Sequence, residues 1–167
     1  VHTPYDVMAG AACALALVIG LRPIFFCDGD RGIKTLIGIL LAMGVAYLLY
    51  VEVYPFPADF DQHNLTSATK NAYTMIGCLM GVAVIYPAEQ KWVNFSTHGK
   101  WWIQLIKILL GLALVLAVKE GLKVPLNLAF GNELMARAVR YFLIVVVAGL
   151  LWPMSFRLWN KLDKSGK

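Results

Sequence analysis

The chain has few charged residues and few cysteines, and both scarcities exclude whole classes of protein. Only 15% of the 167 residues are charged, 59% are hydrophobic, and the mean hydropathy is +0.66. A soluble domain carries about 25% charged residues, so a soluble globular chain is excluded. The three cysteines are too few for a disulfide framework. Because Cys13 and Cys78 lie in apolar runs, we expect them to pack as small hydrophobes, without a redox or zinc function.

Runs of like charge are missing as well. The 15 Lys and Arg residues against 10 Asp and Glu residues give a net charge of +5, but the basic residues are spread along the whole chain. Binding to nucleic acid needs a basic patch or stripe, so we expect no nucleic-acid partner. The chain opens with Val1 and has no basic segment followed by a short apolar stretch and a cleavage site. It therefore carries no signal-peptide pattern, and we expect that a segment upstream of Val1 has been removed.

Long apolar runs are what the sequence does contain. Five segments with almost no charge are separated by turn-forming residues, and a transmembrane helix needs about twenty apolar residues. The predicted spans are 4–22, 34–54, 71–88, 101–119 and 138–157. The predicted fold class is all-α, an integral membrane helical bundle with about five transmembrane helices. We expect a single membrane domain over residues 1–167 that forms the C-terminal part of a larger bundle.

Two features indicate how the spans sit in the membrane and pack. Lys107 lies about one turn inside the fourth span, where we expect its long side chain to snorkel to the headgroups. Gly77 and Gly81 form a Gly-x-x-x-Gly pair in the third span, which lets a neighbouring helix approach closely. We interpret this pair as a packing surface within the bundle. The alternative is contact between two copies, so a homo-oligomer remains a candidate partner.

The distribution of basic residues predicts the orientation in the cell membrane. With the N-terminal end outside, ten of the 15 basic residues lie on the inner side, and the outer side holds only Lys70, Lys119, Lys123, Arg137 and Arg140. Basic residues are enriched on the cytoplasmic side of membrane proteins. We therefore expect His2 on the outer face, which is periplasmic, extracellular or lumenal.

Ionisable groups at the ends of the spans are the candidates for chemistry, because an isolated charge inside lipid is costly. His2 and Asp6 are four residues apart at a helix start, so the carboxylate can fix one imidazole nitrogen and leave the other free to attack an electrophile. A helix N-terminus also suits a phosphate. The alternative is a plain helix start, in which Thr3 caps, Pro4 is the first helical residue and Asp6 closes a capping box.

Residues 2–10 (HTPYDVMAG) resemble the end of the third signature of the type 2 phosphatidic acid phosphatase superfamily, which reads Ser-Arg, five residues, His, three residues, Asp. Residues 138–143 (AVRYFL), followed by Trp152, Pro153 and Phe156, resemble the additional C-terminal helices of some bacterial members. The resemblance implies that His2 is the nucleophile and forms a phosphohistidine, that Asp6 orients it, and that a lipid phosphate is the substrate. It also implies that no metal or organic cofactor is required.

The rest of the family pattern has no counterpart here. The first signature (Lys, six residues, Arg-Pro), the second (Pro-Ser-Gly-His) and the Ser-Arg of the third are missing, and the Arg22-Pro23 pair has no upstream Lys. We expect the C-terminal part of a membrane phosphatase that hydrolyses a lipid-linked phosphate or pyrophosphate. By itself the chain should be inactive, because phosphoryl transfer needs positioned cations. The alternative is a non-enzymatic membrane module, either a transporter piece or a packing domain.

Two further groups of polar residues were candidates for binding. Asp59, Asp61 and His63 alternate in a polar loop and could hold a divalent cation, but no fourth ligand is evident, so we expect no metal. A second group could form a basic rim that attracts a lipid phosphate headgroup, although snorkelling anchors are the preferred interpretation. This group comprises Lys119, Lys123, Arg137 and Arg140, together with Glu120.

Overall fold

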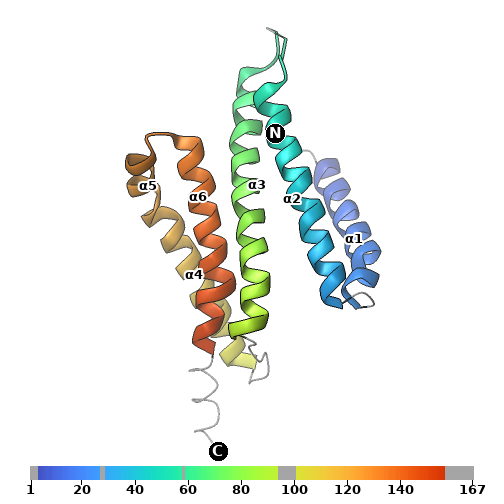
Figure 1. Ribbon diagram of the computed structural model, residues 1–167, viewed down its shortest axis with the longest axis vertical. Coiled ribbons are helices and arrows are strands. Elements are labelled where there is room, and N and C mark those ends of the chain that lie inside the picture. The colour runs from blue at the N-terminus through green and yellow to red at the C-terminus, as the bar shows by residue number, and fades with distance from the viewer. Residues whose placement is uncertain (1–3, 27–28, 58, 94–100, 157–167) are drawn as a thin grey trace, which may run out of the picture. The chain divides into compact units, whose positions relative to one another are not determined.

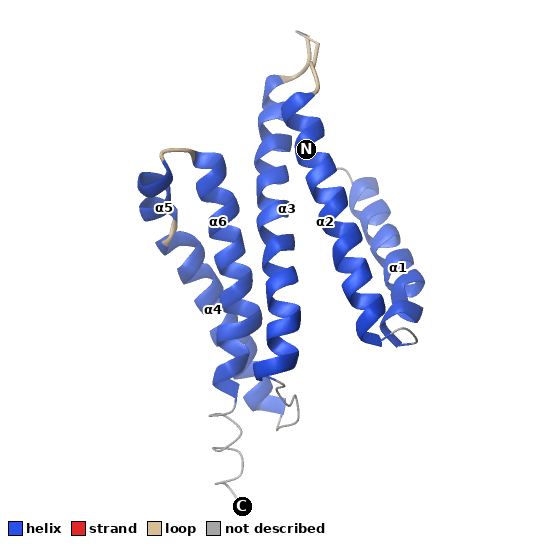
Figure 2. Ribbon diagram, in the orientation of Figure 1, coloured by secondary structure: helices blue, strands red, loops and turns tan. Residues whose placement is uncertain are grey.

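The computed structural model describes residues 4–26, 29–57, 59–93 and 101–156, and its regular elements are all helices (Figures 1 and 2). This confirms the predicted all-α class. The helices are α1 (Pro4–Phe26), α2 (Gly29–Val53), α3 (Gln62–Ala88), α4 (Trp101–Gly121), α5 (Lys123–Phe130) and α6 (Glu133–Val146). Two π-helical turns, η1 (Glu89–Val93) and η2 (Val147–Leu151), continue α3 and α6.

Five helical segments of the described chain are long and apolar enough to cross a membrane: Val7–Ile24, Gly29–Val53, Gln62–Lys91, Trp101–Phe130 and Glu133–Phe156. The predicted membrane helical bundle is therefore confirmed. Some helices reach beyond the predicted spans: α1 continues to Phe26, α2 begins at Gly29 and α3 begins at Gln62. The short helix α5 was not predicted.

The chain divides into two compact units, Val1–Ile39 and Leu40–Lys167. The first unit contains α1 and the start of α2. The side chains of the apolar stretch of α1 are exposed, which suits contact with lipid or with further helices. In the first turn of α2 the Asp30 carboxylate pairs with Lys34 at 2.6 Å, one helical turn along.

A close seam between α3 and α6 organises the second unit. A Cβ added to Gly77 would lie 2.2 Å from the backbone oxygen of Ala138, and one added to Gly81 would lie 2.7 Å from Cγ1 of Val145. The two helices therefore approach as closely as glycine allows, as Figure 1 shows for the adjacent green and red ribbons. The Gly77–Gly81 face is occupied by α6 of the same chain, which confirms its interpretation as a packing surface within the bundle.

Helices α4 and α5 also pack on α6. The apolar side chains buried in this unit are few, and several are small, whereas large apolar side chains point outward. Without water as the solvent, van der Waals contact between small residues holds helices together, and large apolar residues face the lipid. On α4 the outward side chains include Ile108, Leu109, Leu112 and Leu116.

Both π-helical turns lie next to a proline. Pro87 is inside α3 just before η1, and Pro153 follows η2 within the same continuous helix. Proline lacks the backbone N–H, and its ring clashes with the carbonyl four residues earlier, which for Pro153 is that of Gly149 in η2, so this turn widens locally. Helix α1 continues through Pro23 to Phe26, beyond the predicted end of the first span at residue 22.

Aromatic side chains gather at the turn between α2 and α3. The ring centroids of Tyr54 and Phe56 are 5.0 Å apart, and those of Phe56 and Phe60 are also 5.0 Å apart. Tyr50 joins this cluster with its ring 5.2 Å from that of Tyr54. Aromatic clusters of this kind are typical of the membrane–water interface, so the turn is suited to lie at that level.

The α3–α6 seam predicts the effect of the smallest possible substitution. Gly77→Ala should destabilise the second unit by about 1–3 kcal/mol, because the new methyl group meets backbone and forces the helices apart. Gly38→Ala in α2 is the matched control, since nothing lies within 4 Å of its Cβ position. Unfolding of both variants in mixed micelles would measure the difference. Equal stability of the two variants would contradict the close seam.

Candidate functional site

The first candidate site is the start of α1. The helix begins at Pro4, so the backbone of Asp6 lies in its first turn, as predicted. His2 lies outside the described residues, and the pairing of the imidazole with Asp6 therefore stays a prediction. The first turn of a helix presents backbone N–H groups without intrahelical partners and the positive end of the helix dipole. Such a position favours an anionic ligand next to Asp6.

The second candidate, the alternating Asp59, Asp61 and His63, has a structural role at Asp61. One carboxylate oxygen of Asp61 accepts a hydrogen bond from the backbone N–H of His63 at 2.9 Å, and the other accepts one from the side chain of Asn64 at 2.9 Å. Asp61 is therefore the N-cap of α3. Within the described ranges no group of three His, Cys, Asp or Glu side chains could hold a metal ion.

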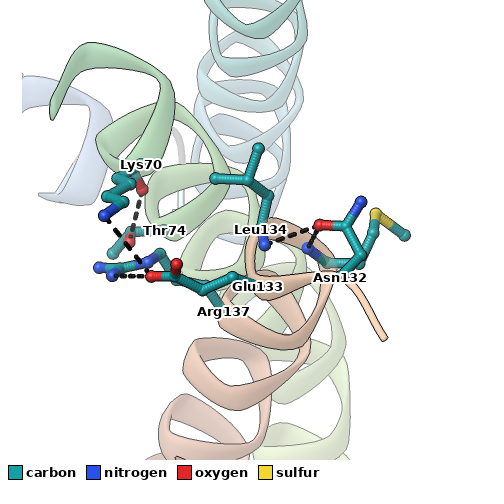
Figure 3. Close-up of polar contacts among 7 residues, drawn as sticks. Lys70, Thr74, Asn132, Glu133, Leu134 and Arg137 are labelled. Carbon is teal, nitrogen blue, oxygen red and sulfur yellow. Dashed lines mark hydrogen bonds and ion pairs between the residues drawn. The ribbon is translucent and has the colours of Figure 1, made fainter. Parts of the chain in front are cut away.

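The third candidate, the basic residues around α6, includes a contact that the sequence did not predict. Glu133 at the start of α6 pairs with Arg137 on the same helix at 3.2 Å and with Lys70 of α3 at 3.6 Å (Figure 3). One carboxylate thus ties the first turns of α6 to α3. Asn132 caps α6 by accepting hydrogen bonds from the backbone N–H groups of Leu134 and Met135 at 2.8 and 3.3 Å.

The other basic residues of this group have different surroundings. Lys119 pairs with the adjacent Glu120 at 3.8 Å, and Lys123 is exposed at the start of α5. The side chains of Lys119 and Glu120 are largely exposed, so their ion pair adds little to the stability of the fold. Lys119 and Lys123 fit the anchoring role that the sequence favoured over a common rim.

Among the described residues of this unit two charged side chains are buried, and the sequence predicted neither burial. Lys107 of α4 is only 2% exposed, and its Nζ lies 4.6 Å from the centroid of the Phe156 ring. The expectation that Lys107 snorkels to the headgroups is therefore wrong, because the aromatic face at the end of the last helix holds the ammonium group instead. The ammonium group contributes to the packing of α4 against the end of the last helix.

Arg140 of α6 is 8% exposed, and its guanidinium carbon lies 5.7 Å from the Tyr141 ring centroid. Its Nε is buried and has no hydrogen-bond partner among the described residues. Ala136, Arg140 and Ile144 are the buried residues of α6 and recur every four positions. That spacing is the one sequence signal that could have indicated burial of Arg140.

Comparison with known proteins bears on this second unit. The family model of the PAP2 superfamily phosphatase transmembrane extension matches residues 73–164, which is more than half of the chain. The chain belongs to this family. The match confirms the resemblance of residues 138–143 and their surroundings to the additional helices of these phosphatases. No curated protein and no solved structure matches the chain.

The PAP2 transmembrane extension thus runs from within α3 through α6, so the described Arg140 and Lys107 belong to it, as does Glu133. The match begins after α2 and does not include the start of α1. The resemblance at residues 2–10 is therefore independent of the family match. The family match places this chain among membrane proteins related to phosphatases.

The shared carboxylate of Glu133 predicts a salt-sensitive contribution to stability. Glu133→Gln should lower the melting temperature slightly, because it removes the ion pairs to Lys70 and Arg137 while keeping the side-chain shape. The difference from the unchanged chain should shrink as salt is added. Glu120→Gln, which removes only the long contact to Lys119, is the control. A shift that is the same at low and high salt would contradict this account.

Proposed function

We propose that this chain is the C-terminal part of a membrane phosphatase that hydrolyses a lipid-linked phosphate or pyrophosphate through a phosphohistidine at His2. The observation that carries the proposal is the match to the PAP2 superfamily phosphatase extension over residues 73–164. The segment that resembles the third phosphatase signature, residues 2–10, lies earlier in the same chain. A transmembrane extension joined to a nucleophile motif is the arrangement expected of such an enzyme.

The reaction follows from the chemistry of a histidine paired with a carboxylate. The Asp6 carboxylate accepts a hydrogen bond from one imidazole nitrogen of His2, and the other nitrogen attacks phosphorus. The bond between phosphorus and the leaving oxygen breaks, and a general acid protonates the leaving group. Water then attacks the phosphohistidine, which releases inorganic phosphate and restores the imidazole.

The start of α1 supports binding of the phosphoryl group. Its unpaired backbone N–H groups and the helix dipole lower the energy of an anion held there. The predicted orientation places this helix start on the outer side of the membrane. A lipid phosphate would then reach His2 from the outer leaflet, where its headgroup lies.

The negative charge of the transferring phosphoryl group would be neutralised by cations outside these 167 residues. Phosphoryl transfer spreads negative charge over the equatorial oxygens, and positioned Lys or Arg side chains stabilise that charge. In the family these cations belong to signatures that have no counterpart in the 167 residues. We therefore propose that the chain alone is inactive and that activity requires the polypeptide carrying those signatures.

Removal of the nucleophile tests the proposal most directly. In a polypeptide that joins the missing signatures to this chain, His2→Ala should lower phosphate release from a lipid phosphate by about a thousandfold or more. It should also abolish the acid-labile phosphohistidine trapped by rapid quenching with radiolabelled substrate. His63→Ala is the control, because that residue is exposed and only its backbone N–H is used by the α3 cap. Full activity of the His2 variant would support the non-enzymatic membrane module instead.

The role of Asp6 predicts a different pattern. Asp6→Asn keeps the size of the side chain but removes its charge, so formation of the phosphohistidine should slow by about a hundredfold or more without disappearing. Rapid-quench measurement of the phosphohistidine gives this rate. If Asp6 only completes a helix cap, the rate should stay unchanged while the stability of α1 falls.

A further inference from the structure

The buried arginine of α6 poses a problem of charge. A guanidinium group removed from water is stable only when an anion or several hydrogen-bond acceptors take over its hydration. Arg140 is 8% exposed, its Nε has no partner among the described residues, and its one ring contact is to the adjacent Tyr141. The ring at 5.7 Å cannot replace a charged partner for the five N–H donors of arginine.

Four acidic residues at this end of the second unit interact with groups other than Arg140. Glu52 interacts with the Tyr73 hydroxyl group, and Asp61 caps α3. Glu120 pairs with its neighbour Lys119, and Glu133 is shared between Lys70 and Arg137. No ion pair within the described ranges joins a carboxylate to Arg140. The site therefore has excess positive charge, to which Arg137, whose own Nε is buried and unpaired, also contributes.

The position of Arg140 along α6 selects the kind of anion. Arg140 lies seven residues after Glu133, which corresponds to about 10 Å along the helix. From Arg140 to Phe156 the helix rises by about 24 Å, most of the roughly 30 Å thickness of the hydrocarbon core. Arg140 is thus placed near one boundary of the hydrocarbon core, at the depth where phospholipid phosphates are within reach of a long side chain.

Arg140 lies on the side of α6 that faces away from α3. Ala138 faces α3 across the seam, and a residue two positions further lies roughly on the opposite side of the helix. That side is covered by α4 and α5, which pack on α6. We propose that Arg140 binds the phosphate group of a bilayer phospholipid beside α4 and α5, with Arg137 adding charge. Guanidinium groups bind phosphate oxygens through paired hydrogen bonds, which suits this residue.

This binding goes beyond the proposed phosphatase reaction and uses neither His2 nor Asp6. Its test measures lipid binding rather than catalysis, so failure of one proposal leaves the other intact. The full chain is purified in detergent and titrated with dioleoylphosphatidylglycerol, and bound lipid is counted by native mass spectrometry. Dioleoylglycerol, which has the same acyl chains without the phosphate, and inorganic phosphate alone are the comparison ligands.

Arg140→Met keeps an apolar side chain of similar length, and it should weaken binding of dioleoylphosphatidylglycerol by about tenfold or more. Lys91→Met is the matched control, because it removes an exposed positive charge in η1, at the opposite end of α3 from the Lys70–Glu133 pair, and should bind as the unchanged chain does. Arg140→Lys keeps the charge but loses the paired hydrogen bonds, so its affinity should fall between the two. This variant also tests the proposal if Arg140→Met does not fold.

The melting temperature in lipid-free detergent shows whether the partner of Arg140 is a phospholipid or a carboxylate of the protein. If a phospholipid supplies the anion, Arg140→Met in lipid-free detergent should melt at the same or a higher temperature than the unchanged chain, because a buried unpaired charge has been removed. Lower stability of Arg140→Met without lipid would indicate a carboxylate partner and overturn the proposal. Equal binding of dioleoylglycerol and dioleoylphosphatidylglycerol would also overturn it. Stabilisation by inorganic phosphate alone, lost in Arg140→Met, would keep Arg140 as a phosphate ligand and change the source to free phosphate.

Discussion

The close approach of α3 and α6 is the constraint on which the second unit depends. In lipid, apolar side chains gain nothing by leaving their surroundings, so helices associate through contact of small residues and through polar bonds. Gly77 and Gly81 allow the backbone of α6 to lie against α3, and α4 and α5 cover another side of α6. The ion pair of Lys70 with Glu133 joins α3 to α6 at the polar start of α6. Packing at one seam thus positions the charged residues of the unit.

Ion pairs and a contact with an aromatic ring stabilise charged side chains in the second unit. Glu133 serves two cations, and Lys107 lies over an aromatic ring. Each of these interactions offsets part of the free-energy cost of moving a charged group out of water. Arg137 and Arg140 both have a buried Nε without a hydrogen-bond acceptor among the described residues, but Arg137 pairs with Glu133 whereas Arg140 has no ion pair there, so we propose an external anion as the partner of Arg140. With both proposals, this phosphatase-related membrane protein would bind phosphate groups at two sites, the proposed nucleophile His2 and the proposed lipid ligand Arg140.

The helical class and the number of spans follow from composition and the length of apolar runs, because a backbone in lipid must satisfy its hydrogen bonds internally. The family relation of the C-terminal helices and the packing role of Gly77 could also be predicted from the sequence. The ends of the helices could not be predicted as well from the sequence. Pro23 does not stop α1, and α5 forms where only a loop was expected, because packing and neighbouring backbone bonds override local stop signals.

The sequence by itself determined that the chain is a helical membrane protein related to phosphatases, and it made His2 and Asp6 candidates through their spacing and the resemblance of residues 2–10 to a phosphatase signature. These properties depend on residue type and on distance along the chain. Only the tertiary structure decided that Lys107 is buried against Phe156, that Lys70 meets Glu133, and that Arg140 is enclosed without a described carboxylate. Such contacts join residues far apart in the chain, so they depend on how the helices pack rather than on any local pattern.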